Sequence, residues 1–199
     1  MKIVLATSNK GKVKEIKELL HDFEVVTYSE IIDEFPIIED GDTFKDNAII
    51  KAKAVYEALN DSDAVVLADD SGISIDALGG KPGIYSARYA GESASDKDNL
   101  YKAVDELKAR GISSSNAHYT AAIAIVDRDG VRCVHGWMHG VAISQTRGSN
   151  GFGYDPMFIP DGFELTLAEL DDSVKNELSH RSKALKLVKI LLSLYKKGE

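Results

Sequence analysis

The sequence predicts an α/β protein built around a mixed β-sheet. Near the N-terminus, an apolar run at 2–6 is followed by a helical pattern at about 11–20 and a short apolar run near 24–28, which is a β-α-β order. Further along, two apolar segments are joined by "DRDG", in which Asp129-Gly130 suits a tight hairpin turn. Because the first unit favours parallel strands and the hairpin requires antiparallel ones, the sheet is expected to be mixed.

The composition is that of an ordinary globular protein. The chain has 199 residues, of which 44% are hydrophobic and 28% charged. No apolar run reaches the roughly 20 residues of a membrane span, and the N-terminus lacks a signal-peptide layout. The single cysteine, Cys133, excludes an internal disulfide, and the net charge of −8 argues against a nucleic-acid surface. We therefore expect a cytoplasmic protein without a membrane or nucleic-acid partner.

Further elements follow from periodicity and from glycine content. The segment "AVVLADDSG" is expected to be a buried strand that ends in a polar turn, with a second short strand in "ISIDAL". Glycine-rich loops are expected in "DALGGKPGIYSARYAG" and "RGSNGFGYDPMF". Helices are expected at about 43–59, with Thr43 and Asp46 as a capping box, at about 96–110 and at about 180–197.

The first candidate site is "TSNKGK", directly after the first apolar run. Backbone amides at a strand-to-helix turn bind anions, and the helix N-terminus adds positive potential. The stretch is not the G-x-x-x-x-G-K-[ST] loop, and a polar helix start with Ser8 or Asn9 as N-cap explains it equally well. Two lysines at a helix N-terminus oppose the helix dipole, so a bound anion would relieve a conflict. The candidate anion ligands are Thr7, Ser8, Asn9, Lys10, Gly11 and Lys12.

The second candidate site is the pair Asp69 and Asp70 in "LADDSG". Two adjacent carboxylates at the end of an apolar strand call for a compensating cation, typically Mg²⁺. Since neighbouring side chains of a strand point to opposite faces, one of the two can bind metal while the other orients loop backbone. The alternative is an Asp-Ser-Gly turn with a capping aspartate.

An acidic stretch before the second helix adds further candidates. Glu39, Asp40 and Asp42 either contribute a metal ligand or complement the helix dipole. Within that helix, Lys51 follows Asn47 by four residues and can project toward the same pocket as Lys12, although a solvated lysine fits the pattern equally well.

Two later stretches have the chemistry of a base pocket. In "GFGYDP", Phe152 or Tyr154 can lie on a flat ligand and Asp155 can bond to its edge, unless the aromatic residues plug a turn. In "SHRSKA", His180 and Arg181 follow a possible cap and offer donors, unless they are simply solvated; Lys175 lies shortly before. By contrast, no zinc site is expected from the histidines His118, His135 and His139, because all three lie on probable strands and none has a cysteine partner.

Taken in order, these segments resemble the inosine triphosphate pyrophosphatase family, whose members are noncanonical purine nucleoside triphosphate pyrophosphatases. The segments carrying the resemblance span residues 5–185 and are "LATSNKGKVKEI", "TFKDNAIIKAKA", "LADDSGISIDALGGKPGIYSARYAG", "NGFGYDPMF" and "SHRSKAL". The resemblance implies hydrolysis of ITP, dITP and XTP to the monophosphate and pyrophosphate with Mg²⁺. It also implies a homodimer of a single 1–199 domain, with two lobes, an elongated mixed sheet flanked by helices, and an active site in the cleft.

The resemblance also implies roles for individual residues. Thr7 to Lys12 would hold the triphosphate with help from Lys51, and Ser71 would touch the substrate. Glu39 and Asp70 would bind the metal, joined by Asp69 if both aspartates contribute, and Asp70 would also be the general base. The base pocket would consist of Phe152, Gly153, Tyr154, Asp155, Lys175, His180 and Arg181. Family members commonly carry E-x-G-x-T-F, and here both variable positions are acidic, so the supply of the carboxylate by Glu39 alone is left open.

Two rival functions remain compatible with these residues. An aspartate-nucleophile phosphatase would use Asp69 or Asp70 and would release orthophosphate. A nucleotide-sensing module would have the phosphate pocket but no chemistry.

Overall fold

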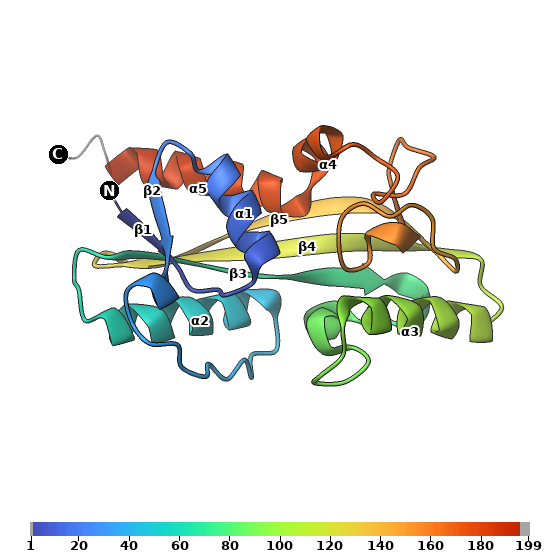
Figure 1. Ribbon diagram of the computed structural model, residues 1–199, viewed down its shortest axis with the longest axis horizontal. Coiled ribbons are helices and arrows are strands. Elements are labelled where there is room, and N and C mark those ends of the chain that lie inside the picture. Colours follow the sequence, from blue (N-terminus) through green and yellow to red (C-terminus); the bar gives the residue numbers. More distant parts are fainter. Residues whose placement is uncertain (1, 196–199) are drawn as a thin grey trace. The chain divides into compact units, whose positions relative to one another are not determined.

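Six strands form one mixed sheet in the order β2-β1-β3-β4-β5-β6 (Figure 1). The structure is a computed structural model that describes residues 2–195. β1 is parallel to both β2 and β3, and β6 is antiparallel to β5, so the predicted mixed sheet is confirmed. The strands are β1 (Lys2–Leu5), β2 (Glu24–Thr27), β3 (Val65–Ile75), β4 (Ser114–Asp127), β5 (Gly130–Ile143) and β6 (Phe158–Pro160).

The helices predicted from periodicity are present, and α4 is an additional short helix. They are α1 (Lys10–Leu19), α2 (Phe44–Leu59), α3 (Asp96–Ala109), α4 (Asp172–Leu178) and α5 (His180–Tyr195). Asn9 caps α1 by accepting from the Lys12 amide, and Thr43 caps α2 by accepting from the Asp46 amide. The predicted end of the last helix at 197 falls outside the described residues. Within the described part of the chain, no helix is long and apolar enough to cross a membrane.

The predicted break in the third strand is wrong. β3 runs without interruption from Val65 to Ile75, so "LADDSG" contains no turn, and the alternative Asp-Ser-Gly turn is wrong for the same reason. Gly72 is a glycine because of packing: a Cβ there would lie 2.3 Å from the Ser86 Oγ and 2.6 Å from the Gly83 carbonyl oxygen. Gly72, which indicates a turn in the sequence, is therefore a position where β3 closely approaches the segment that carries Gly83 and Ser86.

The chain divides into two compact units. Unit 1 comprises residues 1–70, 121–136 and 181–199, and unit 2 comprises 71–120 and 137–180. Each unit has apolar clusters of its own.

In unit 1, alternate residues of each strand pack against different helices. Ile3 and Leu5 of β1, with Val65 and Leu67 of β3, pack with α1 and α5, whereas Val4 packs with α2. Figure 1 shows α1 and α5 on one face of these strands and α2 on the other. Both faces are thus covered, which explains the continuous apolar runs of β1 and β3.

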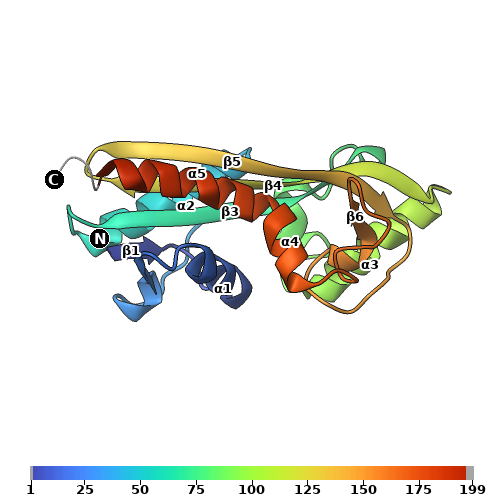
Figure 2. The ribbon, with the colours of Figure 1, turned by 90° about the horizontal axis from the view of Figure 1, so that it is seen from above.

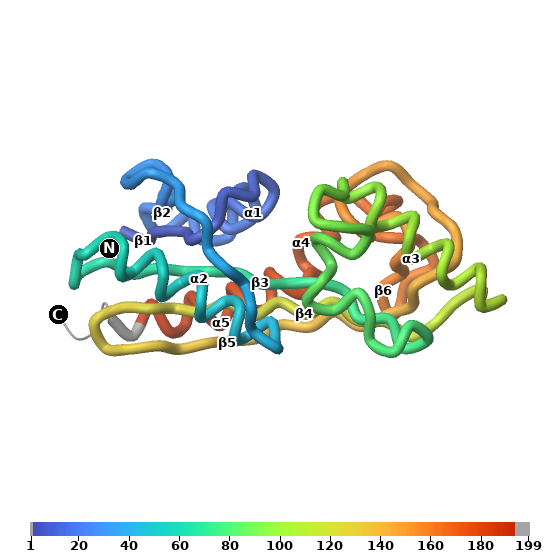
Figure 3. Tube along the Cα trace, turned by 90° about the horizontal axis from the view of Figure 1, so that it is seen from below, coloured from blue at the N-terminus to red at the C-terminus, as the bar shows by residue number. Residues whose placement is uncertain are grey.

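The irregular segment 31–43 belongs to the α2 side of unit 1. Its residues Ile32, Phe35 and Ile37 pack against the cluster that contains Ala48 and Ala52 of α2. The tube in Figure 3 follows this segment past α2 before the chain enters that helix. The packing brings the acidic residues that follow Ile37 to the start of α2.

In unit 2, one core joins segments that are far apart in the sequence. Leu100 and Leu107 of α3 pack with Phe158 of β6, and Val174 and Leu178 of α4 pack against the same cluster. Figure 2 shows α3, β6 and α4 gathered around this core. Tyr154 and Met157 of the glycine-rich loop at 147–157 belong to this core, which anchors the loop and the polar residues on it.

We predict that Gly72→Ala destabilises the protein because the new methyl group has no room against Ser86 and the Gly83 carbonyl. Overpacking of this kind costs about 1–3 kcal/mol, which urea denaturation measures. Ser74→Ala, at a half-buried position of the same strand, is the matched control and should change the free energy of unfolding far less. An unchanged urea midpoint for Gly72→Ala would contradict the close-packing role.

Candidate active site

The two adjacent aspartates of β3 have different surroundings because they point to opposite faces of the strand. Asp69 continues the row of Val65 and Leu67 toward α1 and α5, and Asp70 continues the row of Val66 and Ala68 toward α2. Both are buried, with exposed fractions of 2% and 8%. Their neighbours therefore decide what each can do.

Asp69 lies among cations. Its Oδ2 is 2.7 Å from the Lys12 Nζ and 3.5 Å from the Arg181 Nε. Although burial opposes ionisation, Arg181 and Lys12 hold the pKa of Asp69 well below its usual range. Arg181 also pairs with Glu15 of α1, a residue for which the sequence offered no signal. This ion cluster ties β3, α1 and α5 together within unit 1.

Asp70 lies on the other face, beside a carboxylate of the same sign. The Lys51 Nζ contacts both the Glu39 Oε2 at 2.6 Å and the Asp70 Oδ1 at 3.0 Å. Burial raises the pKa of Asp70 in spite of Lys51 and Lys12, and the nearby Glu39 raises it further. The two carboxylates keep Lys51 charged although burial opposes this, so the pKa of Lys51 is raised. Lys51 is therefore not a solvated lysine.

The loop that carries Glu39 is held by α2. The Gly41 amide donates to the Oδ1 of Asn47, a residue that is 1% exposed, at 2.9 Å. A Cβ at Gly41 would lie 2.7 Å from the Asp46 Cβ, so the loop approaches the helix as closely as a glycine allows. Asp40 and Asp42 are exposed, whereas Glu39 is half-buried and turned to Lys51. Of the three acidic residues, Glu39 is the one that contacts Lys51, which in turn contacts Asp70.

Glu39 and Asp70 fit a divalent cation of the Mg²⁺ type. The Asp70 Oδ2 is buried and has no hydrogen-bond partner among the described residues, which leaves one oxygen available to a cation or water. Mg²⁺ is usually held by one or two carboxylates together with waters and substrate phosphates. In the part of the chain that the structure describes, no three His, Cys, Asp or Glu side chains are grouped around one point. A two-carboxylate site is consistent with both observations.

The "TSNKGK" segment forms the turn between β1 and α1, as predicted. The Asn9 side chain caps the helix, and the Asn9 amide donates to the Thr7 Oγ1 at 3.2 Å. Ser8, Asn9 and Lys10 are exposed, and the first turn of α1 contains no acidic residue. The capping interpretation is thus confirmed for Asn9, and it leaves the exposed groups open to an anion.

In unit 2, Asp155 organises the second predicted cluster. Its Oδ2 is 2.5 Å from the Lys175 Nζ and accepts from the Phe152 amide at 3.1 Å. The Lys175 Nζ lies 4.8 Å from the centroid of the Phe152 ring, which is 40% exposed. Gly151 has φ +78°, and a Cβ there would lie 2.2 Å from the Asp155 Oδ2, so the loop wraps closely around this carboxylate.

The two aromatic residues of "GFGYDP", which flank Gly153, differ in role. Tyr154 is 5% exposed and donates to the Ser86 carbonyl oxygen at 2.9 Å. Its ring is therefore packed beneath the turn and is not accessible to a flat ligand. Phe152 remains accessible because the positive φ of Gly151 and of Gly153 turns the backbone on either side of it. The prediction that either ring can serve as a platform is therefore narrowed to Phe152.

His180 and Arg181, which are consecutive, have different neighbours. In unit 2, the His180 ring stacks on Tyr119 with 4.8 Å between centroids, and the Tyr119 hydroxyl lies 3.4 Å from the Asp155 Oδ1. In unit 1, Arg181 belongs to the Asp69 cluster. Both are buried, which excludes the alternative that they are solvated. Sequence reasoning missed Tyr119, since an aromatic residue in a strand carries no functional signal.

Ser71 is half-buried on β3 next to Asp70.

Comparison with known proteins identifies the family of this chain. The sequence profile of the Ham1 family matches residues 3–190. The chain belongs to the Ham1 family. Its relatives include the dITP/XTP pyrophosphatase of Sulfurimonas denitrificans, 61% identical, with 96% of this chain and 98% of the relative aligned. The dITP/XTP pyrophosphatase of Nautilia profundicola is 62% identical, with 96% and 97% aligned.

Solved structures of this family share the fold. The Staphylococcus aureus Ham1 protein superposes with a TM-score of 0.86 at 38% identity, covering 97% of this chain and 98% of that one. A nucleoside-triphosphatase/dITP/XTP pyrophosphatase from Mycobacterium abscessus gives a TM-score of 0.75 at 34% identity, covering 94% and 98%. The resemblance to purine nucleoside triphosphate pyrophosphatases and the α/β fold that it implied are thus confirmed.

We predict that the two aspartates of this Ham1-family protein differ in their effect on stability. Asp69→Asn leaves Lys12 and Arg181 without their shared counter-ion, and breaking a buried ion pair costs about 3–5 kcal/mol. Asp70→Asn removes a carboxylate that burial disfavours, while Lys51 keeps Glu39, so the free energy of unfolding should stay within about 1 kcal/mol or rise. Urea denaturation of both variants measures the difference, and equal losses would contradict these roles.

Proposed function

We propose that this protein hydrolyses noncanonical purine nucleoside triphosphates, namely ITP, dITP and XTP, to the monophosphate and pyrophosphate. The activity removes deaminated purines from the nucleotide pool. The observation that carries the proposal is the Glu39–Lys51–Asp70 cluster, in which two carboxylates share one buried lysine. The Asp70 Oδ2 in this cluster has no hydrogen-bond partner among the described residues. The names of relatives that are 52–62% identical over nearly their whole length support the substrate class.

The triphosphate is held in unit 1 by the turn between β1 and α1. Its exposed residues Ser8, Asn9 and Lys10 present amides and a lysine at the N-terminus of a helix whose first turn contains no acidic residue. Lys12 and Lys51 add positive charge close by, each already oriented by an aspartate of β3. Asp69 thereby acts as a positioning residue for Lys12 and Arg181, and not as the metal ligand that the resemblance implies.

A Mg²⁺ ion is the cofactor that the residues fit. Glu39 and Asp70 would hold it, and when bound it would neutralise charge on the phosphate oxygens and on the leaving pyrophosphate. Asn47 positions Glu39 for this task through the Gly41 amide.

Asp70 is the residue we assign as general base. Its available oxygen orients a water molecule and accepts a proton from it while the water oxygen forms a bond to the α-phosphorus. The bond between the α-phosphorus and the bridging oxygen breaks, and its electron pair leaves with pyrophosphate. Lys51 and Lys12 offset the negative charge that develops on the phosphate oxygens.

Base recognition is assigned to unit 2. Phe152 offers an exposed ring for stacking, and Asp155 and Lys175 present an acceptor and a donor beside it. His180, oriented by Tyr119, supplies a further donor for the 6-keto oxygen that hypoxanthine and xanthine have and adenine lacks. Ser71 contacts the substrate next to Asp70. Gly153 and Tyr154 shape the loop, and Arg181 acts on the substrate only through the Asp69 cluster.

The resemblance to purine nucleoside triphosphate pyrophosphatases supports three further proposals about the whole protein. The two units work as the two lobes of one domain, the protein forms a homodimer, and it acts in the cytoplasm, where nucleotide pools are used. Light scattering coupled to size-exclusion chromatography tests the homodimer directly.

The first experiment is a substrate panel with purified protein and Mg²⁺. We expect pyrophosphate from ITP, dITP and XTP and little product from GTP or ATP, because the adenine edge presents an amino donor where the pocket donors require an acceptor. We expect little product from GTP because the family that this chain resembles acts on noncanonical purines. Orthophosphate as the product would instead favour the aspartate-nucleophile phosphatase, and equal rates on all five nucleotides would contradict the specificity.

The second experiment is Asp70→Asn, which we expect to lower kcat by about 10²–10⁴-fold, as for loss of a general base. Asp63→Asn, at an exposed position just before β3, is the matched control and should retain full activity. Pre-steady-state and steady-state pyrophosphate release on ITP measure both variants. Full turnover by Asp70→Asn would contradict the assignment. Binding of ITP without any turnover by the wild type would favour the nucleotide-sensing module.

A further inference from the structure

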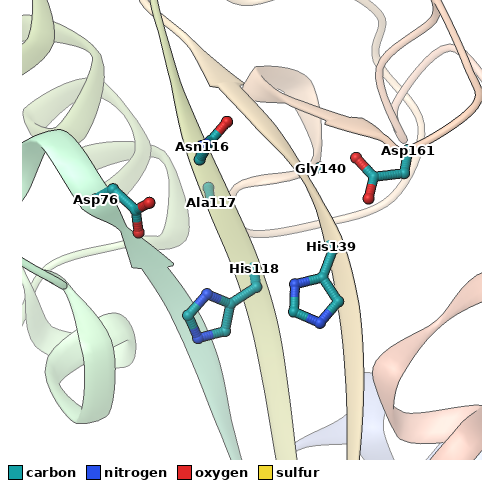
Figure 4. Close-up of a pocket in the computed structure, with 7 residues that line it drawn as sticks. All are labelled: Asp76, Asn116, Ala117, His118, His139, Gly140 and Asp161. Atoms are coloured by element: carbon teal, nitrogen blue, oxygen red, sulfur yellow. The ribbon is translucent and has the colours of Figure 1, made fainter.

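A second polar site lies in unit 2, apart from the residues assigned above. It is an open cavity of about 380 Å³ over β4 and β5 (Figure 4). Its chemistry-bearing side chains are His118 and His139, with Asp76, Asn116 and Asp161 also lining it. The proposed reaction uses none of these residues, so the cavity needs a different explanation.

The two histidines form a cross-strand pair. β4 ends at Asp127 and β5 begins at Gly130, and His118 and His139 lie the same number of residues from these two ends. The hairpin register therefore puts them opposite each other, and their ring centroids are 5.6 Å apart with 37° between the ring planes. Figure 4 shows the two rings side by side on one face.

The pair is accessible and flanked by carboxylates. His139 is exposed and His118 half-buried, so both rings line the cavity without being enclosed by the core. The Asp161 amide donates to the His139 carbonyl oxygen at 3.0 Å, which fixes Asp161 to β5. Asp76 is the first residue after the end of β3 at Ile75. Figure 4 shows the carboxylates of Asp76 and Asp161 on either side of the histidine pair.

We propose that His118 and His139 together bind one late first-row transition-metal ion, with Zn²⁺ as the representative species. Neutral imidazole is a preferred ligand of Zn²⁺, Cu²⁺ and Ni²⁺, whereas Mg²⁺ prefers carboxylate and water oxygens. The site is therefore distinct in chemistry from Glu39 and Asp70. Because no group of three His, Cys, Asp or Glu side chains surrounds a common point in residues 2–193, the protein supplies two ligands and water completes the coordination.

The hairpin also contains a matched control. His135 lies on the same strand as His139, and the same register places Ala122 opposite it. It is thus a strand histidine without a cross-strand imidazole. A metal site that depends on the pair should not respond to its loss.

The experiment is isothermal titration of the full-length protein with Zn²⁺ in saturating Mg²⁺, which keeps the carboxylate site occupied. We expect one equivalent of Zn²⁺ to bind the wild type. His118→Gln and His139→Gln should each weaken binding by about tenfold or more, because even loss of a residue that only supports a ligand costs about 10–100-fold. His135→Gln should bind as the wild type does.

A spectroscopic readout supplements the titration. With Cu²⁺ as the probe, electron paramagnetic resonance should show coupling to two imidazole nitrogens in the wild type and to fewer in either variant. Pyrophosphate release from ITP with Mg²⁺ should be unchanged in both variants, which establishes that they fold. Absence of Zn²⁺ binding, or binding that survives both substitutions, or equal weakening by His135→Gln, would overturn the proposal.

Discussion

The opposite orientation of neighbouring side chains along β3 is the constraint on which the charged site depends. Asp69 and Asp70 are adjacent in sequence, yet one packs with α1 and α5 and the other with α2. Had both faced one side, two buried carboxylates would have repelled each other in a low-dielectric environment. The strand instead gives each carboxylate its own cations, Lys12 and Arg181 for Asp69 and Lys51 for Asp70.

This division separates a stabilising role from a reactive one. Asp69 is surrounded by cations that keep it ionised, so its charge links α1 and α5 to the strand. Asp70 shares Lys51 with Glu39 and retains an oxygen without a partner among the described residues. Such incomplete compensation is unfavourable for stability, and it is what a site needs in order to accept a cation and a water. The apolar packing of unit 1 holds both arrangements in place.

Much of this arrangement is predictable from local sequence, and the failures have physical causes. The helix starts at Asn9 and Thr43 follow from capping chemistry, which depends on a few neighbouring residues. The break predicted at Gly72 is wrong because a glycine signals either a turn or a close contact, and only Ser86, distant in sequence, distinguishes them. Likewise, no short spacing motif joins His118 to His139, and only the register of the hairpin places them side by side.

The sequence by itself determined the α/β class, the family and the identity of the candidate residues, because these depend on periodicity and on residue types in a fixed order. The tertiary structure decided how those residues are partnered. Arg181 forms ion pairs with Asp69 and Glu15. Tyr154 is buried and donates a hydrogen bond to the Ser86 carbonyl oxygen, so it is not accessible. The tertiary structure also selected Glu39 over its acidic neighbours. Partnership is decided by distances between segments that are remote in the chain, and only packing of the strands and helices sets those distances.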